Sequence, residues 1–421
     1  CEPRYESVDG TISMSSSHPP SPRSTPNMTP SLALIIVGVV VMIAGGLGFT
    51  LFIPMILPPQ ASTQAQQVDQ LFTFLLFFGG VIFILVEGVI LVSVIRFRAQ
   101  PGDLADGPPV SGNTTLELVW TAIPAVLVTV LAILSYTVWI NTRAIPPNEM
   151  SVGATAARFA WTFNYEVSQE TLPTTLNFSD LKPEIQADLT DEDGVVHFSN
   201  PKLYTWVGQP VVMEMQSQDV NHAFWIPAMR VKQDVLPGRT TEIRFTPTMA
   251  GHYRIVCAEL CGSGHGAMAG TEGPDGELLG AWLIVYETEE DYLANFFDPA
   301  AATVLVPPDD PALLGRQILA SGAYPCSTCH TLDDQGWAGI VGPNLNGIGD
   351  RAADRAQTTG DADAAAYIEH SIRHPGDYLV PGFGNLMTQF NPDSGQPNYM
   401  PQSDLDAIVA YLLTQTANPS N

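Results

Sequence analysis

The sequence predicts a membrane protein in three parts: transmembrane helices, an all-β sandwich, then an all-α domain. Three long apolar runs occupy the N-terminal third, short strand-like segments with turn residues follow, and helical apolar spacing returns near the C-terminus. The expected parts are a disordered Ser- and Pro-rich tail (1–30), membrane helices (31–145), a sandwich (146–290), an acidic linker (291–310) and a helical domain (311–421).

The apolar runs are Leu32–Leu57, Leu71–Ile95 and Leu118–Ile140. Each exceeds the roughly 20 residues needed to cross a bilayer as a helix. Buried core helices are excluded by this length and by the near absence of charge. Glu87 is the exception, and a carboxylate at that depth is expected to face protein or water. A contact with a neighbouring subunit is favoured over a proton-transfer role.

The distribution of arginines predicts the orientation. The segment 58–70 has no Lys or Arg, the segment after the second run begins Arg96-Phe-Arg98, and the N-terminal tail carries further arginines. Basic residues stay on the cytoplasmic side. Segment 58–70 and everything after Asn141 are therefore expected outside. A lipidated Cys1 would invert this topology, so lipidation is disfavoured, and Met14 is an alternative start.

A cluster of soft ligands stands near the middle of the chain. Cys257, Cys261, His265 and Met268 fall within one short string, and His222 lies upstream. Sulfur donors with imidazole favour copper or another thiophilic metal. A Cys2His2 zinc site is an alternative, but zinc makes little use of a thioether. A Cys257–Cys261 disulfide would leave both histidines and the methionine unexplained.

The string C-x-E-x-C-G-x-G-H-x-x-M resembles the binuclear copper (CuA) loop of subunit II of the haem–copper oxidases, the cytochrome c oxidases. The resemblance implies this ligand set: bridging Cys257 and Cys261, terminal His222 and His265, axial Met268 and the backbone carbonyl of Glu259. In the family the side chain of Glu259 also reaches a magnesium ion shared with subunit I. The segments Val211–Gln216, Thr241–Thr246 and Leu283–Tyr286 suit the family's cupredoxin-like sandwich, with ligands on loops at one end.

A second motif, Cys326-Ser-Thr-Cys329-His330, is the attachment signature of c-type haem. Both thiols bind the haem covalently and His330 ligates the iron. A thioredoxin-like pair would follow a strand and needs no histidine after it. Gly342–Leu345 and the helical pattern of Ser403–Leu413 resemble class I cytochromes c. Haem attachment requires an oxidising compartment, which places this domain outside the bacterial plasma membrane.

Two methionines compete for the sixth position of the haem iron. Met400 precedes a proline, as this ligand often does, but it stands directly before the terminal helix. Met387 follows Pro381-Gly-Phe and precedes Phe390, which resembles the ligand loop of fused family members, although Thr388 replaces the usual proline. Met387 is the favoured ligand, with Met400 as the alternative.

Asn113–Pro124 resembles the family signature that enters its second helix. By this resemblance Glu117 lies near the cytoplasmic mouth of a proton pathway into subunit I. A carboxylate favoured by the dipole at a helix N-terminus is equally consistent. The first apolar run departs from the family's two-helix pattern. An uncleaved signal anchor and an added helix are the two alternatives for it.

Aromatic residues from Phe159 to Tyr165 resemble the stretch that covers CuA. Phe159 stands where many members place a tryptophan that receives electrons from soluble cytochrome c. This departure fits a donor built into the same chain. For Phe163 and Tyr165, core packing is an alternative.

Composition narrows the function classes. The chain has 17 basic and 43 acidic residues, so nucleic acid is an unfavourable partner. No histidine lies between Ser31 and Asn141. A haem–copper oxygen site in the membrane needs several, so oxygen chemistry is expected on a partner subunit.

These features predict subunit II of a bacterial cytochrome c oxidase fused to a cytochrome c domain, as in caa-type enzymes. Electrons would pass from its haem c to CuA and on to haem a and the haem–copper site of subunit I, reducing O2 to water with proton translocation. Expected partners are subunits I and III, the membrane, and a quinol-oxidising complex or cytochrome c as donor. Two alternatives are a subunit of a nitric oxide reductase-like enzyme and a tethered electron carrier without an oxidase partner.

Overall fold

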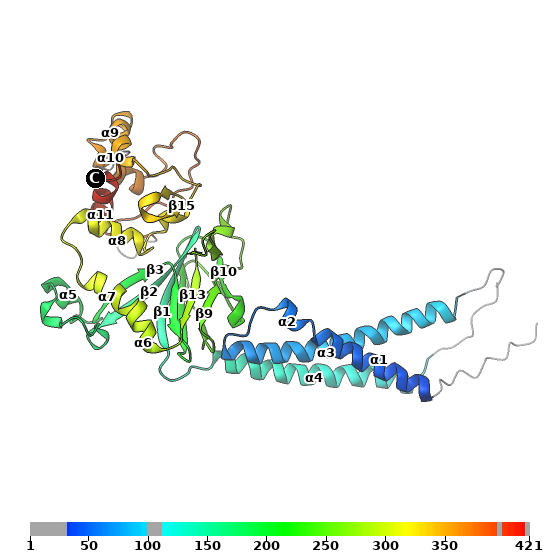
Figure 1. The fold of residues 1–421 in the computed structure, drawn as a ribbon. Coiled ribbons are helices and arrows are strands. Elements are labelled where there is room, and N and C mark those ends of the chain that lie inside the picture. The colour runs from blue at the N-terminus through cyan, green and yellow to red at the C-terminus, as the bar shows by residue number, and fades with distance from the viewer. Residues whose placement is uncertain (1–31, 99–111, 394–397, 417–421) are drawn as a thin grey trace, which may run out of the picture.

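The computed structural model describes residues 32–98, 112–393 and 398–416, and has the three expected parts in order. Figure 1 shows long helices at one side, a β-sandwich in the centre and a small helical domain on the sandwich. The fold class predicted from the sequence is confirmed. The expected N-terminal tail (1–30), with Cys1, lies outside the described residues.

The membrane part contains three candidate spans, Ile35–Ile56, Thr63–Arg96 and Thr114–Arg143. Its helices are α1 (Leu32–Thr50), α2 (Ile53–Ile56), α3 (Thr63–Arg96) and α4 (Thr114–Arg143). Their apolar side chains are largely exposed, as lipid contact requires. Helix α3 begins before the expected run at Leu71, because the Ser62 side chain accepts a hydrogen bond from the Ala65 N–H and caps it at 2.9 Å.

The sandwich is built from a five-stranded sheet in the order β3-β2-β1-β5-β8 and two three-stranded sheets, β10-β6-β7 and β4-β13-β9. Strand β1 runs parallel to β5, and β2 returns antiparallel to β1. Alternate side chains of these strands fill one shared core. The strands are β1 (Met150–Ala157), β2 (Ala160–Ser168), β3 (Val195–Asn200), β4 (Leu203–Trp206), β5 (Val211–Ser217), β6 (His222–Ile226), β7 (Val231–Val235), β8 (Thr241–Phe245), β9 (Gly251–Arg254), β10 (Val256–Cys257), β11 (Thr271–Glu272), β12 (Leu278–Leu279) and β13 (Trp282–Tyr286), with helix α5 (Pro183–Asp188) between β2 and β3.

The structure differs from the prediction that residues 291–310 form a linker. Most of it is helical: α6 (Glu289–Tyr292), a π-helical turn (Leu293–Phe297) and α7 (Asp298–Leu305). Its apolar side chains enter the sandwich core: Tyr292, Phe296, Phe297, Ala301 and Leu305. Its acidic residues are exposed except for Asp298, which is half-buried, so the composition of the segment is that of a solvated linker. Only 306–310 connects the two outer domains without a helix.

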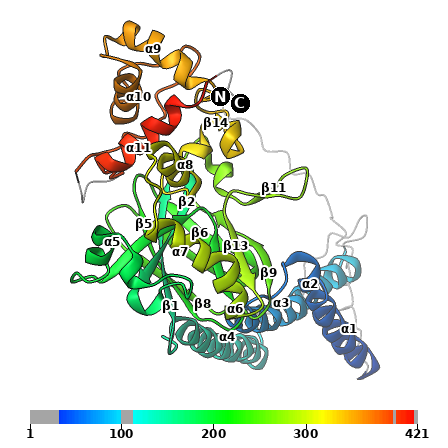
Figure 2. The same cartoon turned by 60° about the vertical axis from the view of Figure 1, so that its left-hand side comes forward.

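The C-terminal domain packs α8 (Pro311–Ala320), α9 (Ile348–Thr359), α10 (Ala364–Arg373) and α11 (Gln402–Leu413), with a small ribbon of β14 (Thr331–Leu332) and β15 (Trp337–Ala338). Helices α8 and α11 cross closely at Gly315, where an added Cβ would collide with the Ala407 carbonyl. The domain has its own core. It sits on the sandwich (Figure 2), and the Thr162 hydroxyl donates to the Gly322 carbonyl across the boundary at 2.9 Å.

Candidate copper and haem centres

Adjacent strands bring the first two predicted copper ligands together. Strand β10 pairs with β6, so Cys257 lies beside Phe224 and close to His222 at the start of β6. The His222 side chain is fully buried, and its Nδ1 lies 3.8 Å from Cys257 Sγ. The Cys257 thiol also points at the Glu259 carbonyl oxygen, 3.2 Å away.

The following loop returns the remaining soft ligands to the same place. Cys261 Sγ lies 3.5 Å from His265 Nδ1 and 3.4 Å from Met268 Sδ. The short 3-10 turn His265–Met268 makes this return possible. The ligand atoms of His222, Cys257 and Cys261 all lie within 4.8 Å of one another. The structure therefore brings together every residue of the predicted ligand set.

The electrostatics of the thiols suit a metal centre. Burial opposes ionisation of Cys257, but hydrogen bonds from His222 and nearby backbone groups outweigh it and lower its pKa to about 7. Burial and the neighbouring Cys257 raise the pKa of Cys261. One thiol thus loses its proton readily and the second resists ionisation beside it. A cation binding both sulfurs would remove this conflict. The buried thioether of Met268 makes the donor set fit copper better than zinc.

Sequence reasoning missed the residue that orients His222. Asp219 Oδ1 lies 2.9 Å from His222 Nε2, which leaves Nδ1 directed at the thiols. Burial raises the pKa of Asp219, but hydrogen bonds with His222, the Val220 N–H and the Arg158 N–H outweigh it and lower the pKa to about 2. An acidic residue three positions before a ligand histidine was the available signal, since such carboxylates commonly fix the ring.

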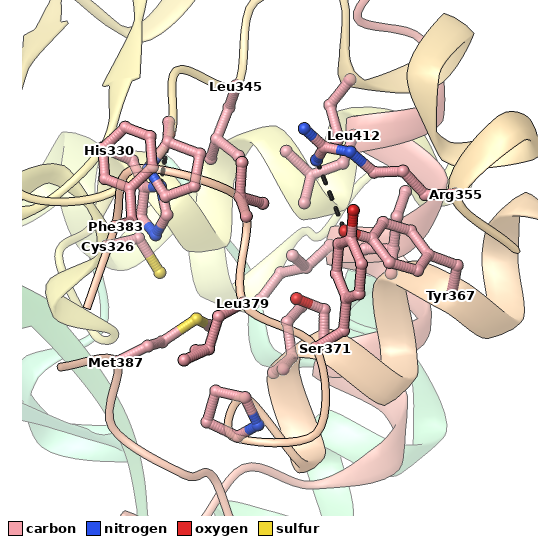
Figure 3. Close-up of a pocket in the computed structure, with 18 of the residues that line it drawn as sticks. Cys326, His330, Leu345, Arg355, Tyr367, Ser371, Leu379, Phe383, Met387 and Leu412 are labelled. Carbon is pink, nitrogen blue, oxygen red and sulfur yellow. Dashed lines mark hydrogen bonds between the residues drawn. The ribbon is translucent and has the colours of Figure 1, made fainter. Parts of the chain in front are cut away.

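The second motif lines a largely apolar cavity of about 900 Å³, counted with its open mouth (Figure 3). His330 and Met387 lie at the same end of it, near the Cys326 thiol. His330 Nδ1 lies 2.7 Å from the Pro343 carbonyl, which fixes that nitrogen as the donor and leaves Nε2 free. Gly342 touches the imidazole so closely that a Cβ there would collide with the ring.

The cavity's chemistry fits a covalently bound haem. Burial lowers the pKa of His330, so the ring is neutral, as a metal ligand must be. Burial also raises the pKa of Cys326 to about 12 and that of Cys329, which keeps both thiols protonated. At the opposite end Arg355 donates to the Tyr367 hydroxyl at 3.4 Å, supplying a positive charge for carboxylates in an otherwise apolar lining.

The two candidate methionines occupy different places. Met387 lines the cavity that His330 lines. Met400 is buried in the domain core, where its carbonyl accepts a hydrogen bond from Arg373 at 3.0 Å. Met400 is absent from the described residues that line the cavity. Met387 as the sixth ligand remains a proposal that this placement favours.

Three other residues singled out from the sequence lie outside the two sets of ligands. Glu117 lies in the first turn of α4, where its carboxylate accepts a hydrogen bond from the Asn113 N–H at 3.2 Å. Glu87 is an exposed residue within α3. Phe159 packs against Gly262 and Gly264 of the copper loop.

Phe163 and Tyr165 are buried members of the sandwich core, so the alternative of core packing holds for both. Neither side chain lies at the surface, where a soluble carrier would dock.

Comparison with known proteins decides the family. Three family models match in order: the transmembrane domain of cytochrome c oxidase subunit II over 50–138, its periplasmic domain over 150–271, and cytochrome c over 314–416. Cytochrome c oxidase subunit 2 of Synechocystis sp. is 34% identical over 232 residues, which cover 51% of this chain and 70% of that protein. The chain belongs to the cytochrome c oxidase subunit 2 family.

Two further matches have lower sequence identity. Cytochrome c oxidase subunit 2 of Alkalihalophilus pseudofirmus is 27% identical and matches 78% of this chain and 81% of its own length. The crystal structure of the periplasmic domain of subunit II from Bradyrhizobium japonicum is 24% identical, with a TM-score of 0.25, and covers 37% of this chain and 96% of its own. The assignment rests on the sequence matches.

Membership fixes the coarse function. This protein is a cytochrome c oxidase subunit II with a C-terminal cytochrome c domain, and its two outer domains imply CuA copper and haem c. The protein is anchored in the membrane, and its family membership implies a complex with oxidase subunit I. The subunit II match begins at residue 50, the last residue of α1, so α1 lies almost entirely before the matched range.

Proposed function

We propose that this subunit passes electrons from its own haem c to CuA, and on to haem a and the haem–copper site of subunit I, for oxygen reduction coupled to proton translocation. The observation that carries the proposal is a narrow cleft between the two outer domains. Arg158 of the sandwich lines it together with Cys326, Cys329 and Met387 of the haem domain. The haem-bearing motif thus faces the copper domain of the same chain.

The site residues have the following proposed roles. Two coppers held by this donor set would supply one-electron transfer with little rearrangement of the ligands. His222, Cys257, Glu259, Cys261, His265 and Met268 would hold them, while Cys326, Cys329, His330 and Met387 would hold the haem. The burial of His222 and both thiols excludes water from the copper centre.

Contacts with subunit I involve two further glutamates. The Glu259 side chain is exposed next to its inward-facing carbonyl, so it is free to share a magnesium ion with subunit I. Glu117, at the α4 end remote from the sandwich, would serve the proton pathway. We also propose a multi-pass subunit of the bacterial plasma membrane, with subunit III in the complex and a quinol-oxidising complex or cytochrome c as donor.

The test uses the purified complex. It should consume oxygen with ascorbate and a mediator in the absence of soluble cytochrome c, and its haem c should be oxidised when oxygen is mixed with the reduced enzyme. Haem c that stays reduced while oxygen is consumed would contradict the proposal. A polypeptide carrying haem a should co-purify; its absence would favour the reductase-like or tethered-carrier alternatives.

A further inference from the structure

The turn between β1 and β2 places Arg158 beside the copper loop. Its neighbour Phe159 packs over Gly262 and Gly264, and the Arg158 side chain itself approaches Gly262. Both the backbone N–H and the side-chain Nε of Arg158 donate to Asp219 Oδ2, at 2.8 Å and 3.2 Å. The arginine therefore holds this carboxylate from one side.

The other oxygen of the same carboxylate holds a copper ligand. Asp219 Oδ1 is 2.9 Å from His222 Nε2 and also accepts the Val220 N–H at 2.6 Å. His222 Nδ1 faces Cys257 Sγ. A continuous chain of contacts thus runs from Arg158 through Asp219 and His222 to the thiols.

Arg158 also meets the haem domain. In the cleft that contains Cys326, Cys329 and Met387, it is the one lining residue contributed by the sandwich among the described residues. Nearby in β2, the hydrogen bond from Thr162 to the Gly322 carbonyl joins the same two domains. Among the described residues, Arg158 alone both lines this cleft and donates to the Asp219 carboxylate that orients a copper ligand.

We propose that Arg158 is the positioning residue that couples the haem pocket to the copper centre. Its charge offsets the Asp219 carboxylate beside His222, which favours the reduced copper pair, and its side chain bridges the two domains where the electron crosses. The step moves one electron and no proton: the ferrous haem is oxidised to ferric, and the copper pair gains the electron. This inference rests on the proposed function.

The substitution Arg158→Gln separates charge from turn structure, because the backbone N–H of residue 158 still donates to Asp219. Without the guanidinium, the negative charge of Asp219 is less neutralised. Because this carboxylate contacts the copper ligand His222 and not the haem motif, its charge should lower the copper potential more than the haem potential. The Arg158 side chain is 49% exposed, so solvent screens its charge. The equilibrium constant for electron sharing should therefore shift about threefold toward the haem, or about 28 mV for one electron. Arg158→Lys keeps the charge and should retain most of the copper potential.

The experiment is a redox titration of the whole complex, following copper and haem absorption separately, with copper content measured in each variant. Arg244→Gln is the matched control, since Arg244 also holds a carboxylate, Glu149 at 2.9 Å, in β8 near the membrane helices. A shift in Arg158→Gln alone supports the proposal. An unchanged potential, an equal shift in the control, or copper loss in both Arg158 variants overturns it. A wild-type complex in which haem and copper exchange no electron would instead refute the proposed function.

Discussion

The guanidinium of Arg230 donates two hydrogen bonds to the carboxylate of Asp69, from Nε to Oδ1 at 2.9 Å and from Nη2 to Oδ2 at 3.0 Å. Both side chains are buried, with exposed fractions of 9% and 4%. Arg230 also donates to the carbonyls of Pro227 and Pro58. Because Asp69 belongs to α3 and Arg230 to the sandwich, this ion pair fixes the copper domain on the outer end of a membrane helix.

Replacing Asp69 by alanine should destabilise the outer domain strongly. The change leaves the Arg230 charge buried without its partner, which costs about 3–5 kcal/mol in comparable proteins. Thermal unfolding of the detergent-solubilised complex measures the loss. The control is Asp309→Ala, whose partner is Lys182 and whose own side chain is 95% exposed. That exposed pair is worth at most about 1 kcal/mol, so equal losses in the two variants would contradict the prediction.

The sequence could not have predicted this contact. Asp69 and Arg230 are separated by 161 positions, and neither belongs to a motif. The membrane helices, by contrast, follow from runs of apolar residues, which are local. The α6–α7 segment is intermediate in how well the sequence predicts it. Its aromatic residues were visible, but the acidic residues beside them concealed a stretch that packs in the core.

Replacing Cys257 or Cys261 by serine should abolish the two-copper centre and leave the haem spectrum intact. Each thiol lies against different partners of the set, His222 for one and His265 for the other, so neither substitution leaves a complete site. Copper analysis and the visible haem bands of the purified complex test this. Two coppers per chain in either variant would refute the assignment.

The copper ligands were predictable because most of them share one short string whose spacing carries the chemistry. The partners that orient them were less so. Asp219 acts through one side-chain oxygen, and His330 is oriented by the carbonyl of Pro343. A backbone carbonyl leaves no trace in residue type, so only the folded loop shows which nitrogen of His330 is free.

His370 should make the stability of the haem domain depend on pH. Its Nε2 lies 3.1 Å from Asp377 and its Nδ1 2.9 Å from Asp361, and these two carboxylates raise its pKa. The protonated ring is therefore favoured in the folded state. Its stabilisation is complete below the unfolded pKa of about 6.5 and disappears as pH rises through the higher folded value.

The measurement is the melting temperature of the haem domain in the complex across this pH window. The difference between wild type and His370→Gln should be largest at the acidic end and vanish at the alkaline end. Asp377→Asn should weaken the same dependence, because it removes the larger cause of the raised pKa. A difference that grows with pH would show that the sign is wrong.

Met387→Leu should remove the weak near-infrared sulfur-to-iron band and lower the haem potential, because a thioether ligand raises it. Met387 lines the cavity with His330, whereas Met400 is buried among the core residues of the domain. Met400→Leu conserves volume, so it should retain the band and cost less than about 1.5 kcal/mol of stability. Spectra and potentials of the two variants, taken on the complex with its haem attached, separate the candidates. Loss of the band in Met400→Leu and its retention in Met387→Leu would reverse the assignment.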